Sequence, residues 1–133
     1  MKYDELIKHI QSFAQSDSRE QAEQATHGTL EVLAERIVGD EAGQLAAQLP
    51  DPVGNCLRGR EGQNGSHFSL KEFYLRVSEK TGMEPVATVT WVRAVFAVLN
   101  SAVTPGEFAD IRANLSDDYQ ELFASPEDLE VQR

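Results

Sequence analysis

The chain has 133 residues, with 22 acidic and 12 basic side chains and a formal net charge of −10 at pH 7. This length is enough for one domain with a sizeable core, and 41% hydrophobic residues is an ordinary globular composition. The negative charge repels the phosphates of nucleic acids and anionic membranes, so we expect neither as a partner. The single cysteine, Cys56, excludes an internal disulfide. Met1–Glu5 is acidic where a signal peptide would need an apolar core, so we predict a cytoplasmic protein.

The first half of the chain is typical of helices. Residues 3–14 carry apolar side chains at three- and four-residue spacing, which predicts an amphipathic helix. Either Asp17 with Glu20 or Ser18 with Gln21 has the spacing of a capping box for a second helix over about 18–38. The inner face of this second helix is expected to comprise Ala22, Thr26, Leu30, Leu33 and Ile37.

Further boundaries follow from glycine and proline. Gly39 is expected to end the second helix, because glycine readily adopts the left-handed conformation that follows a helix. Asp40 then caps a third helix over 41–49. The next prolines end that helix and allow a short helical turn with Val53 and Leu57 inward.

A glycine-rich segment separates the two halves. Residues 59–67 contain three glycines among polar residues, which is typical of a linker. They lack the lysine and serine or threonine of a phosphate-binding loop. Ser69–Glu72 is a capping box that opens a helix ending at Thr81-Gly82.

The most apolar stretch is Val86–Val103, in which thirteen of eighteen residues are apolar when alanine is included. A helix that is apolar on most sides must be buried by several neighbours or lie in lipid. Five polar residues interrupt the run, so we predict a long buried helix over about 85–103. Val and Thr also favour strands, but the run is too long for one strand.

The end of the chain repeats the same helix signals. Thr104 as cap, Pro105 at the first position and Glu107 at the third predict another helix. Asp117 is expected to cap a last short helix ending near Phe123. Residues 124–133 form an acidic tail, for which a frayed helix and a disordered segment are both open.

The two halves match when the chain is shifted by 66 residues, which indicates an internal repeat. The shift superposes Glu41 on Glu107, and the apolar and acidic residues around that pair also coincide, namely Leu45 with Ile111, Leu49 with Leu115 and Asp51 with Asp117. We therefore predict an all-α fold: one compact helical bundle of two pseudo-symmetric repeats, about 3–57 and 69–123, within a single domain, 1–133.

Several motifs also resemble a known family. They are the Ala46–Pro50 corner, Arg93–Leu99, Thr104–Phe108 and Ile111–Leu115. In combination they look like an uncharacterised bacterial family known only as a domain of unknown function, over about residues 3–123. The chain departs from the family pattern where Ser116 stands in place of a second corner proline. The resemblance implies an all-helical bacterial protein and no activity, cofactor or catalytic residue.

Arg93 is the most informative candidate for ligand binding, because it is the only charge in the long apolar helix. A fixed arginine near Trp91 could hold a carboxylate or phosphate, with Tyr74 as a third candidate. The alternative, which we favour, is that the guanidinium reaches the surface or pairs with an acid of its own fold.

The sequence predicts no metal site and no catalytic group. Glu23, His27 and Glu31 lie four residues apart along one helix, but this spacing differs from that of di-metal carboxylate bundles and is absent from the second half. We therefore predict a surface row. Acidic pairs such as Asp40-Glu41 begin helices, where the macrodipole stabilises negative charge without any catalytic role.

These observations favour a non-catalytic binding or regulatory protein that acts through contacts with another protein, with a second copy of the chain as one candidate partner. No cofactor is expected. The alternative is a carrier or sensor of a small anionic ligand, bound in a pocket between the two repeats and lined by Trp91, Arg93 and Tyr74. An enzyme ranks third.

Overall fold

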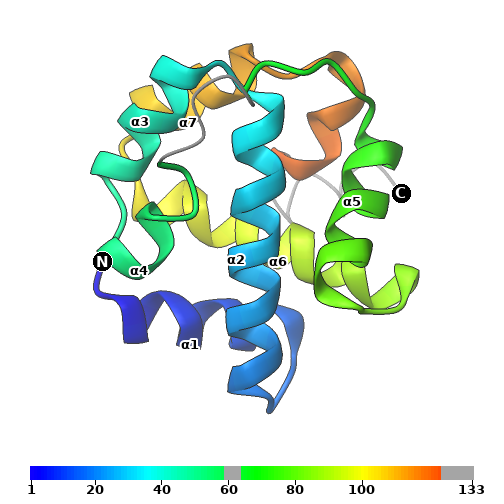
Figure 1. Ribbon diagram of the computed structural model, residues 1–133. Helices are drawn as coiled ribbons and strands as arrows, with labels where there is room; N and C mark the ends of the chain where they lie inside the picture. The colour runs from blue at the N-terminus through cyan, green and yellow to red at the C-terminus, as the bar shows by residue number, and fades with distance from the viewer. Residues whose placement is uncertain (59–63, 124–133) are drawn as a thin grey trace, which may run out of the picture.

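The described part of the chain is built from helices and contains no strand, which confirms the all-α prediction (Figure 1). The computed structural model describes residues 1–58 and 64–123. The predicted tail, 124–133, and part of the predicted linker, 59–63, lie outside the described residues. In chain order the elements are α1 (Tyr3–Ala14), α2 (Arg19–Arg36), α3 (Gly39–Ala47), α4 (Asp51–Gly54), α5 (Leu70–Thr81), α6 (Pro85–Ala102), α7 (Pro105–Ala113) and the 3-10 helix η1 (Asp117–Leu122).

The lengths and order of the helices recur along the chain. Helices α1 and α5 have 12 residues each, α2 and α6 have 18, and α3 and α7 have 9. From α2 onward each helix of the second half begins 66 residues after its counterpart, and α5 begins 67 after α1. The order of helices predicted for each half is therefore observed. The pseudo-symmetry predicted for the two repeats stays a prediction.

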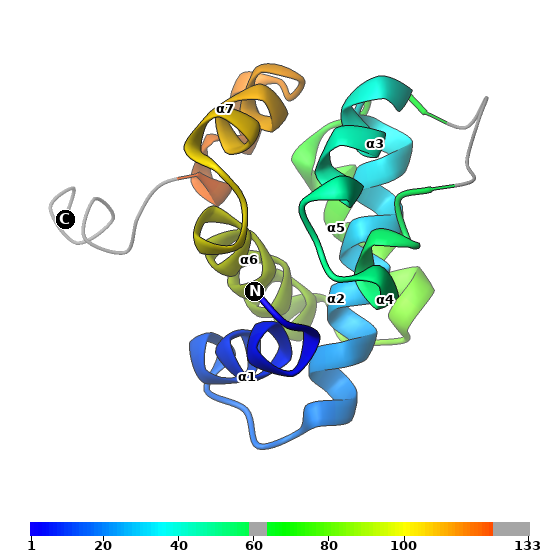
Figure 2. The ribbon, with the colours of Figure 1, turned by 90° about the vertical axis from the view of Figure 1, so that its left-hand side faces the viewer.

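The halves are interlocked rather than separate. Helices α2 and α6 pack against each other, and both α1 and α5 pack against α2 as well as α6. Helices α3 and α7 contact each other and lie at the end of the molecule opposite α1 (Figures 1 and 2). Each half therefore completes the core of the other.

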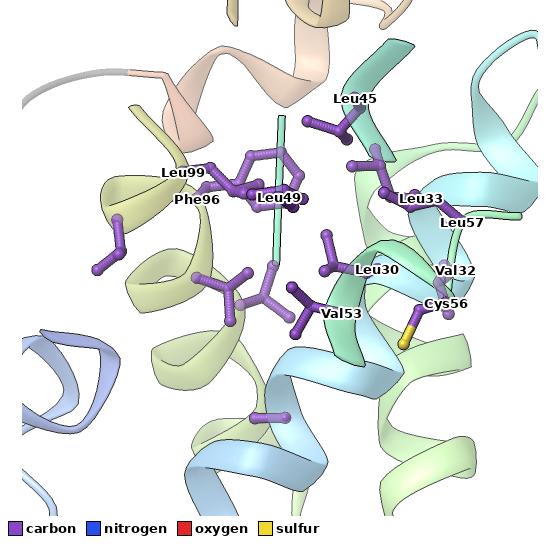
Figure 3. Packing of buried hydrophobic residues seen from close by; sticks show 14 of the residues in the cluster. Leu30, Val32, Leu33, Leu45, Leu49, Val53, Cys56, Leu57, Phe96 and Leu99 are labelled. Carbon is purple, nitrogen blue, oxygen red and sulfur yellow. The ribbon is translucent and has the colours of Figure 1, made fainter. Parts of the chain in front are cut away.

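The core lies between the two long helices. Figure 3 shows Leu30 and Leu33 of α2 and Phe96 and Leu99 of α6 around Leu49, and all five side chains are buried. Burying a leucine or phenylalanine stabilises a fold by about 1.5–3 kcal/mol. The predicted inner face of the second helix is buried throughout.

Helix α6 contributes many of its apolar side chains to the core. By length and mean hydropathy it is the one helix of the described chain that could cross a membrane, but 44% of its residues are buried inside the fold. Trp91, Val95 and Phe96 are among them. An apolar core helix passes the same length and hydropathy test as a membrane span, so the test alone does not place this helix in a membrane.

Serine and threonine caps begin three of the helices. The side chains of Ser18, Ser69 and Thr104 accept hydrogen bonds from the backbone N–H three residues later, at distances of 3.1, 3.2 and 3.2 Å. These are predicted cap positions, with Ser18 rather than Asp17 starting α2. Gly82 ends α5 in the left-handed conformation, with φ of 73°. Local sequence signals therefore determine these ends.

The predicted role of Gly39 is wrong. Helix α2 ends at Arg36, and Ile37 follows in an extended conformation, with φ −90° and ψ 161°. Because Ile37 turns into the core, where it is fully buried, the chain leaves the helix without a left-handed residue. Gly39 instead becomes the first residue of α3, with Val38 rather than Asp40 at the cap position. Likewise Ser116, not Asp117, precedes the last short helix.

One buried arginine joins several segments. Arg36 is 4% exposed, and its guanidinium donates to the Phe68 carbonyl at 3.0 Å, the Asn114 carbonyl at 3.2 Å and the Ser116 hydroxyl at 3.3 Å. It also lies 5.3 Å from the ring centroid of Tyr119. The end of α2 is thereby fixed to the segments before α5 and after α7.

Candidate functional site

Two glutamates meet where α3 and α7 pack against each other. Glu41 is the third residue of α3, and Glu107 is the third residue of α7. The two residues are only 8% and 5% exposed, respectively. We call these two residues the acidic pair. Carboxylates are rarely buried without a partner, so this pair requires a physical explanation.

Two amide side chains explain why the glutamates face each other. In a capping box, the third-position glutamate would accept a hydrogen bond from the N–H of the cap residue. Here the Thr104 N–H donates to Gln48 Oε1 at 2.8 Å, and the Val38 N–H donates to Asn114 Oδ1 at 3.3 Å. Each bond links the two halves. Each amide oxygen accepts the hydrogen bond that the third-position glutamate would accept in a capping box.

These reciprocal bonds and the acidic pair define a structure that we call the α3–α7 joint. It comprises Val38, Glu41, Gln48, Thr104, Glu107 and Asn114. The second three residues follow the first three by 66 positions, although Gln48 pairs with Thr104 and Val38 with Asn114. The joint is therefore built from the same positions of both halves.

The carboxylates of the acidic pair have unsatisfied hydrogen-bonding capacity. Oε1 of Glu41 and Oε1 of Glu107 are buried and have no hydrogen-bond partner. One carboxylate oxygen each from Glu41, Glu107 and the exposed Asp110 lie within 4.8 Å of one another. No ion pair in the described part of the chain involves these three side chains. We call the three together the acidic cluster.

Burial and electrostatic repulsion both oppose ionisation of the acidic pair. Two unit charges no more than 4.8 Å apart repel by about 3 kcal/mol or more at an effective dielectric constant of about 20. The positive end of a helix stabilises each carboxylate by only about 0.3–1 kcal/mol. Burial, and then the charge of Glu41, raise the pKa of Glu107 from 4.5 to about 7. The arrangement therefore favours neutralisation of the acidic pair by a bound cation or a proton.

The predicted ligand-binding residues Tyr74 and Arg93 converge on an acid of the same chain. The Arg93 guanidinium donates to Glu121 Oε2 at 2.6 Å, and the Tyr74 hydroxyl donates to the same oxygen at 2.9 Å. The Arg93 side chain is 52% exposed. Burial, followed by this hydrogen bond, raises the pKa of Tyr74. The third candidate, Trp91, is buried in the core. Binding of an external anion at Arg93 stays a prediction.

The row of Glu23, His27 and Glu31 lines an open groove of about 480 Å³ between α2 and α5. Its acids have partners within the fold: the Tyr3 hydroxyl donates to Glu23 at 2.6 Å, and the Lys80 ammonium lies 3.5 Å from Glu31. Among the described residues, the only group of three side chains placed to share a cation is the acidic cluster, and it does not include this row.

The acidic pair was not predicted as a site. The repeat aligns Glu41 with Glu107, but acids at helix starts were attributed to the macrodipole alone. The 66-residue repeat places the two glutamates at the same position of each half, but other pairs, such as Asp51 with Asp117, are identical too, so the match does not single them out. Burial of both residues depends on contact between α3 and α7, which the alignment by itself does not show.

The fold and the joint define a class of all-helical protein in which two halves of the same helix order meet at a shared acidic pair. The chain belongs to a family described as an uncharacterized conserved protein, DUF2267, whose model matches residues 3–122. The predicted resemblance to a family of unknown function is thus confirmed. No curated protein matches the chain significantly.

Proposed function

We propose that this chain is a non-catalytic binding protein that acts through contacts with another protein and is regulated at the α3–α7 joint. The observation that carries the proposal is the acidic pair, two buried glutamates from equivalent positions with unpartnered oxygens. A buried polar group without a partner costs about 1–3 kcal/mol. Because this cost falls at the contact between the two halves, removing it would favour a closed α3–α7 joint over an open one.

The mechanism follows from the charges at the joint. When both carboxylates are ionised, their repulsion opposes the packing of α3 against α7. When one charge is neutralised, the reciprocal bonds of Gln48 and Asn114 hold the joint closed. Val38, which lies in the joint and exposes 53% of its surface, shifts with it. Opening and closing would therefore change the surface offered to a partner.

A neutral isostere tests the regulation. The amide of Glu41→Gln can donate to Glu107, so we expect hydrogen exchange in α3 and α7 to slow by about tenfold, which corresponds to about 1.4 kcal/mol of opening free energy. Asp40→Asn, an exposed neighbour on the same helix, removes the same charge and should leave exchange unchanged. Equal exchange in the wild type and Glu41→Gln would show that the pair does not control the joint.

The partner requires a separate measurement. Wild type and Glu41→Gln, each immobilised and cross-linked in extract of the native host, should retain the same protein in amounts that differ several-fold. Analytical ultracentrifugation of both forms tests whether the partner is a second copy of the chain. If neither experiment yields a protein that discriminates the two forms, the binding role is wrong.

The anionic-ligand function has one observation in its favour. Arg93 and Tyr74 together already hold a carboxylate, that of Glu121. If they also serve an external anion, Glu121→Gln should strengthen the binding of phosphate or citrate measured by calorimetry. Arg93→Gln should abolish this binding, and Arg112→Gln, an exposed control, should not. Absence of binding to Glu121→Gln would remove this alternative.

A further inference from the structure

We propose that the acidic cluster of Glu41, Glu107 and Asp110 binds one divalent cation of about the size of Ca²⁺. This inference rests on the proposed regulation of the α3–α7 joint and names the ligand that neutralises it. The cluster is more than a group of acids at helix starts, because its two glutamates are more than nine-tenths buried and each has an oxygen without a hydrogen-bond partner.

The ligand atoms match a hard cation in type and number. Carboxylate oxygens are preferred by Ca²⁺ and Mg²⁺, which take the rest of their coordination from backbone carbonyls and water. Glu41 comes from one half and Glu107 from the other. A bound cation would therefore connect α3 to α7 directly.

The coordination preferences of the two cations favour Ca²⁺ at this cluster. Ca²⁺–oxygen distances of about 2.3–2.6 Å place opposite ligands roughly 4.6–5.2 Å apart, whereas Mg²⁺ at about 2.0–2.1 Å places them at roughly 4.2 Å or less. The three oxygens lie within 4.8 Å of one another. This upper limit is compatible with either ion, but Ca²⁺ accepts irregular coordination, whereas Mg²⁺ demands near-ideal octahedral geometry and gives up its water reluctantly, so Ca²⁺ is the better match for two buried carboxylates and one exposed one.

The net charge also favours a cation. The N-termini of α3 and α7 carry roughly half a positive charge each, which opposes cation binding. Three carboxylates outweigh this total of about one charge, and no basic side chain forms an ion pair with them in the described part of the chain. Asp110 is exposed, so the cluster is open to solvent on that side and a hydrated ion can enter.

Calorimetry on the full chain, stripped with chelator and dialysed, tests the proposal with CaCl₂ and MgCl₂ at constant ionic strength. We expect one Ca²⁺ per chain with a dissociation constant of about 1 mM or tighter, and Mg²⁺ binding at least several-fold weaker. Glu41→Gln and Glu107→Gln should each weaken Ca²⁺ binding at least tenfold, and Asp110→Asn should weaken it less, because its side chain is solvated. Asp40→Asn should leave binding unchanged.

Each contrary result is decisive. No Ca²⁺ binding, binding unaffected by the glutamate variants, or an equal loss in Asp40→Asn would overturn the site. Mg²⁺ binding as tight as Ca²⁺ binding would overturn the assignment of cation size. Circular dichroism of each variant separates lost binding from lost folding, and Glu107→Asp, which keeps the charge and shortens the side chain, should retain part of the affinity.

The proposed function and this inference can fail independently. If Glu41→Gln slows hydrogen exchange at the joint but Ca²⁺ does not bind the wild type, the cation site is wrong and the regulated joint stands. If Ca²⁺ binds at the cluster but Glu41→Gln and Ca²⁺ both leave exchange in α3 and α7 unchanged, the cation site stands and the regulatory role is wrong.

Discussion

Arg36 makes several segments depend on one side chain. Replacing it with methionine removes donors from the Phe68 and Asn114 carbonyls and from the Ser116 hydroxyl. A hydrogen bond to a charged group contributes about 1.5–3 kcal/mol. The Phe68 carbonyl keeps a second donor, the Tyr119 hydroxyl at 2.8 Å, and methionine fills part of the space. We expect Arg36→Met to lower the free energy of unfolding by about 2–4 kcal/mol in urea denaturation. Arg112→Met, at an exposed position, should change it by less than about 0.5 kcal/mol; similar losses in both would contradict this role.

The pKa of Glu107 predicts how stability changes with pH. Its folded value is about 7, against 4.5 ordinarily, so the folded state holds this proton more tightly than the unfolded state. The resulting stability is fully present below about pH 4.5 and is lost as pH rises through about 7. It is at most on the order of 3 kcal/mol, since one pKa unit corresponds to about 1.4 kcal/mol.

Glu107→Gln tests this pH dependence, because the amide cannot ionise. In chelator-treated protein, the free energy of unfolding of the wild type should fall relative to Glu107→Gln between pH 5 and 8. Glu41 and Asp110 are the acids that face Glu107, so Asp40→Asn, outside the cluster, should follow the wild type. A constant difference between the wild type and Glu107→Gln would show that this carboxyl has an ordinary pKa in the folded state.

Single-residue roles were the least predictable from the sequence. Arg93 was singled out because it is the only charge in an apolar stretch, but its partner, Glu121, lies 28 residues further along the chain. Arg36 gave no signal, since an arginine near a helix end is usually a surface residue. Such pairings depend on tertiary distances, and helical periodicity gives only the face on which a residue lies.

At the scale of the helices, the crossing of α2 and α5 depends on a glycine. A Cβ at Gly28 would lie 2.7 Å from Thr81 Cγ2, so Gly28→Ala forces either the Thr81 side chain or the helix that carries it to shift. Alanine gains about 1 kcal/mol in helix propensity, but overpacking costs about 1–3 kcal/mol. We expect a net loss of stability, and adding Thr81→Ser, which removes the contacting methyl group, should restore it.

Gly43 is the matched control for that substitution. It also lies inside a helix, but a Cβ there meets no atom within 4 Å. Gly43→Ala should therefore raise the free energy of unfolding by about 0.5–1 kcal/mol. If Gly28→Ala stabilises the protein as much as Gly43→Ala does, close contact between α2 and α5 is not a constraint.

The start of α5 depends on a residue from the other end of the chain. The Leu70 N–H donates to Asp118 Oδ2 at 2.7 Å. The Ser116 hydroxyl and this amide hold the pKa of Asp118 below its usual 3.8. Because the folded pKa is lower than the unfolded value, the contribution is present above pH 3.8 and is lost as pH falls through the lower folded value.

The hydrogen bond from Leu70 to Asp118 should contribute about as much stability as a helix cap. Asp118→Ala should cost about 1 kcal/mol at pH 7, and its difference from the wild type should shrink in strong acid. The neighbouring Asp117→Ala, whose carboxylate has no hydrogen bond to a described residue, should cost less than about 0.5 kcal/mol. Guanidinium denaturation at pH 7 and pH 3 measures both, and equal costs for the two variants would contradict the cap.

Whole helices were predicted more accurately than single residues. The bounds of α1, α5 and α6 agree with the sequence prediction to within a residue, because caps, proline at the first position and apolar spacing are local signals. The α2–α3 corner was misassigned because burial of Ile37 changed the path of the chain there. The joint could not be predicted at all, since it forms only when both corners meet.

At the scale of the molecule, the interlocked halves imply that neither half folds alone. Helix α1 packs on α6, and α5 packs on α2, so a separate half would expose the apolar faces of both its long and its first helix. A chain of about 60 residues has at best a marginal core. These four side chains, Leu30, Leu33, Phe96 and Leu99, pack together in the intact core. Without the second half, Leu30 and Leu33 lose their contacts with Phe96 and Leu99.

We therefore expect fragments 1–63 and 64–133, made separately, to show weak helical circular dichroism and no cooperative thermal transition. Mixed in equal amounts, they should recover the helical spectrum of the intact chain, with a melting temperature that rises with concentration because folding is coupled to association. Phe96→Ala in the second fragment should weaken this recovery, whereas Gly106→Ala, where a Cβ meets nothing within 4 Å, should not. A cooperative transition in either fragment alone would show that a half is a self-sufficient unit and that the core does not require both.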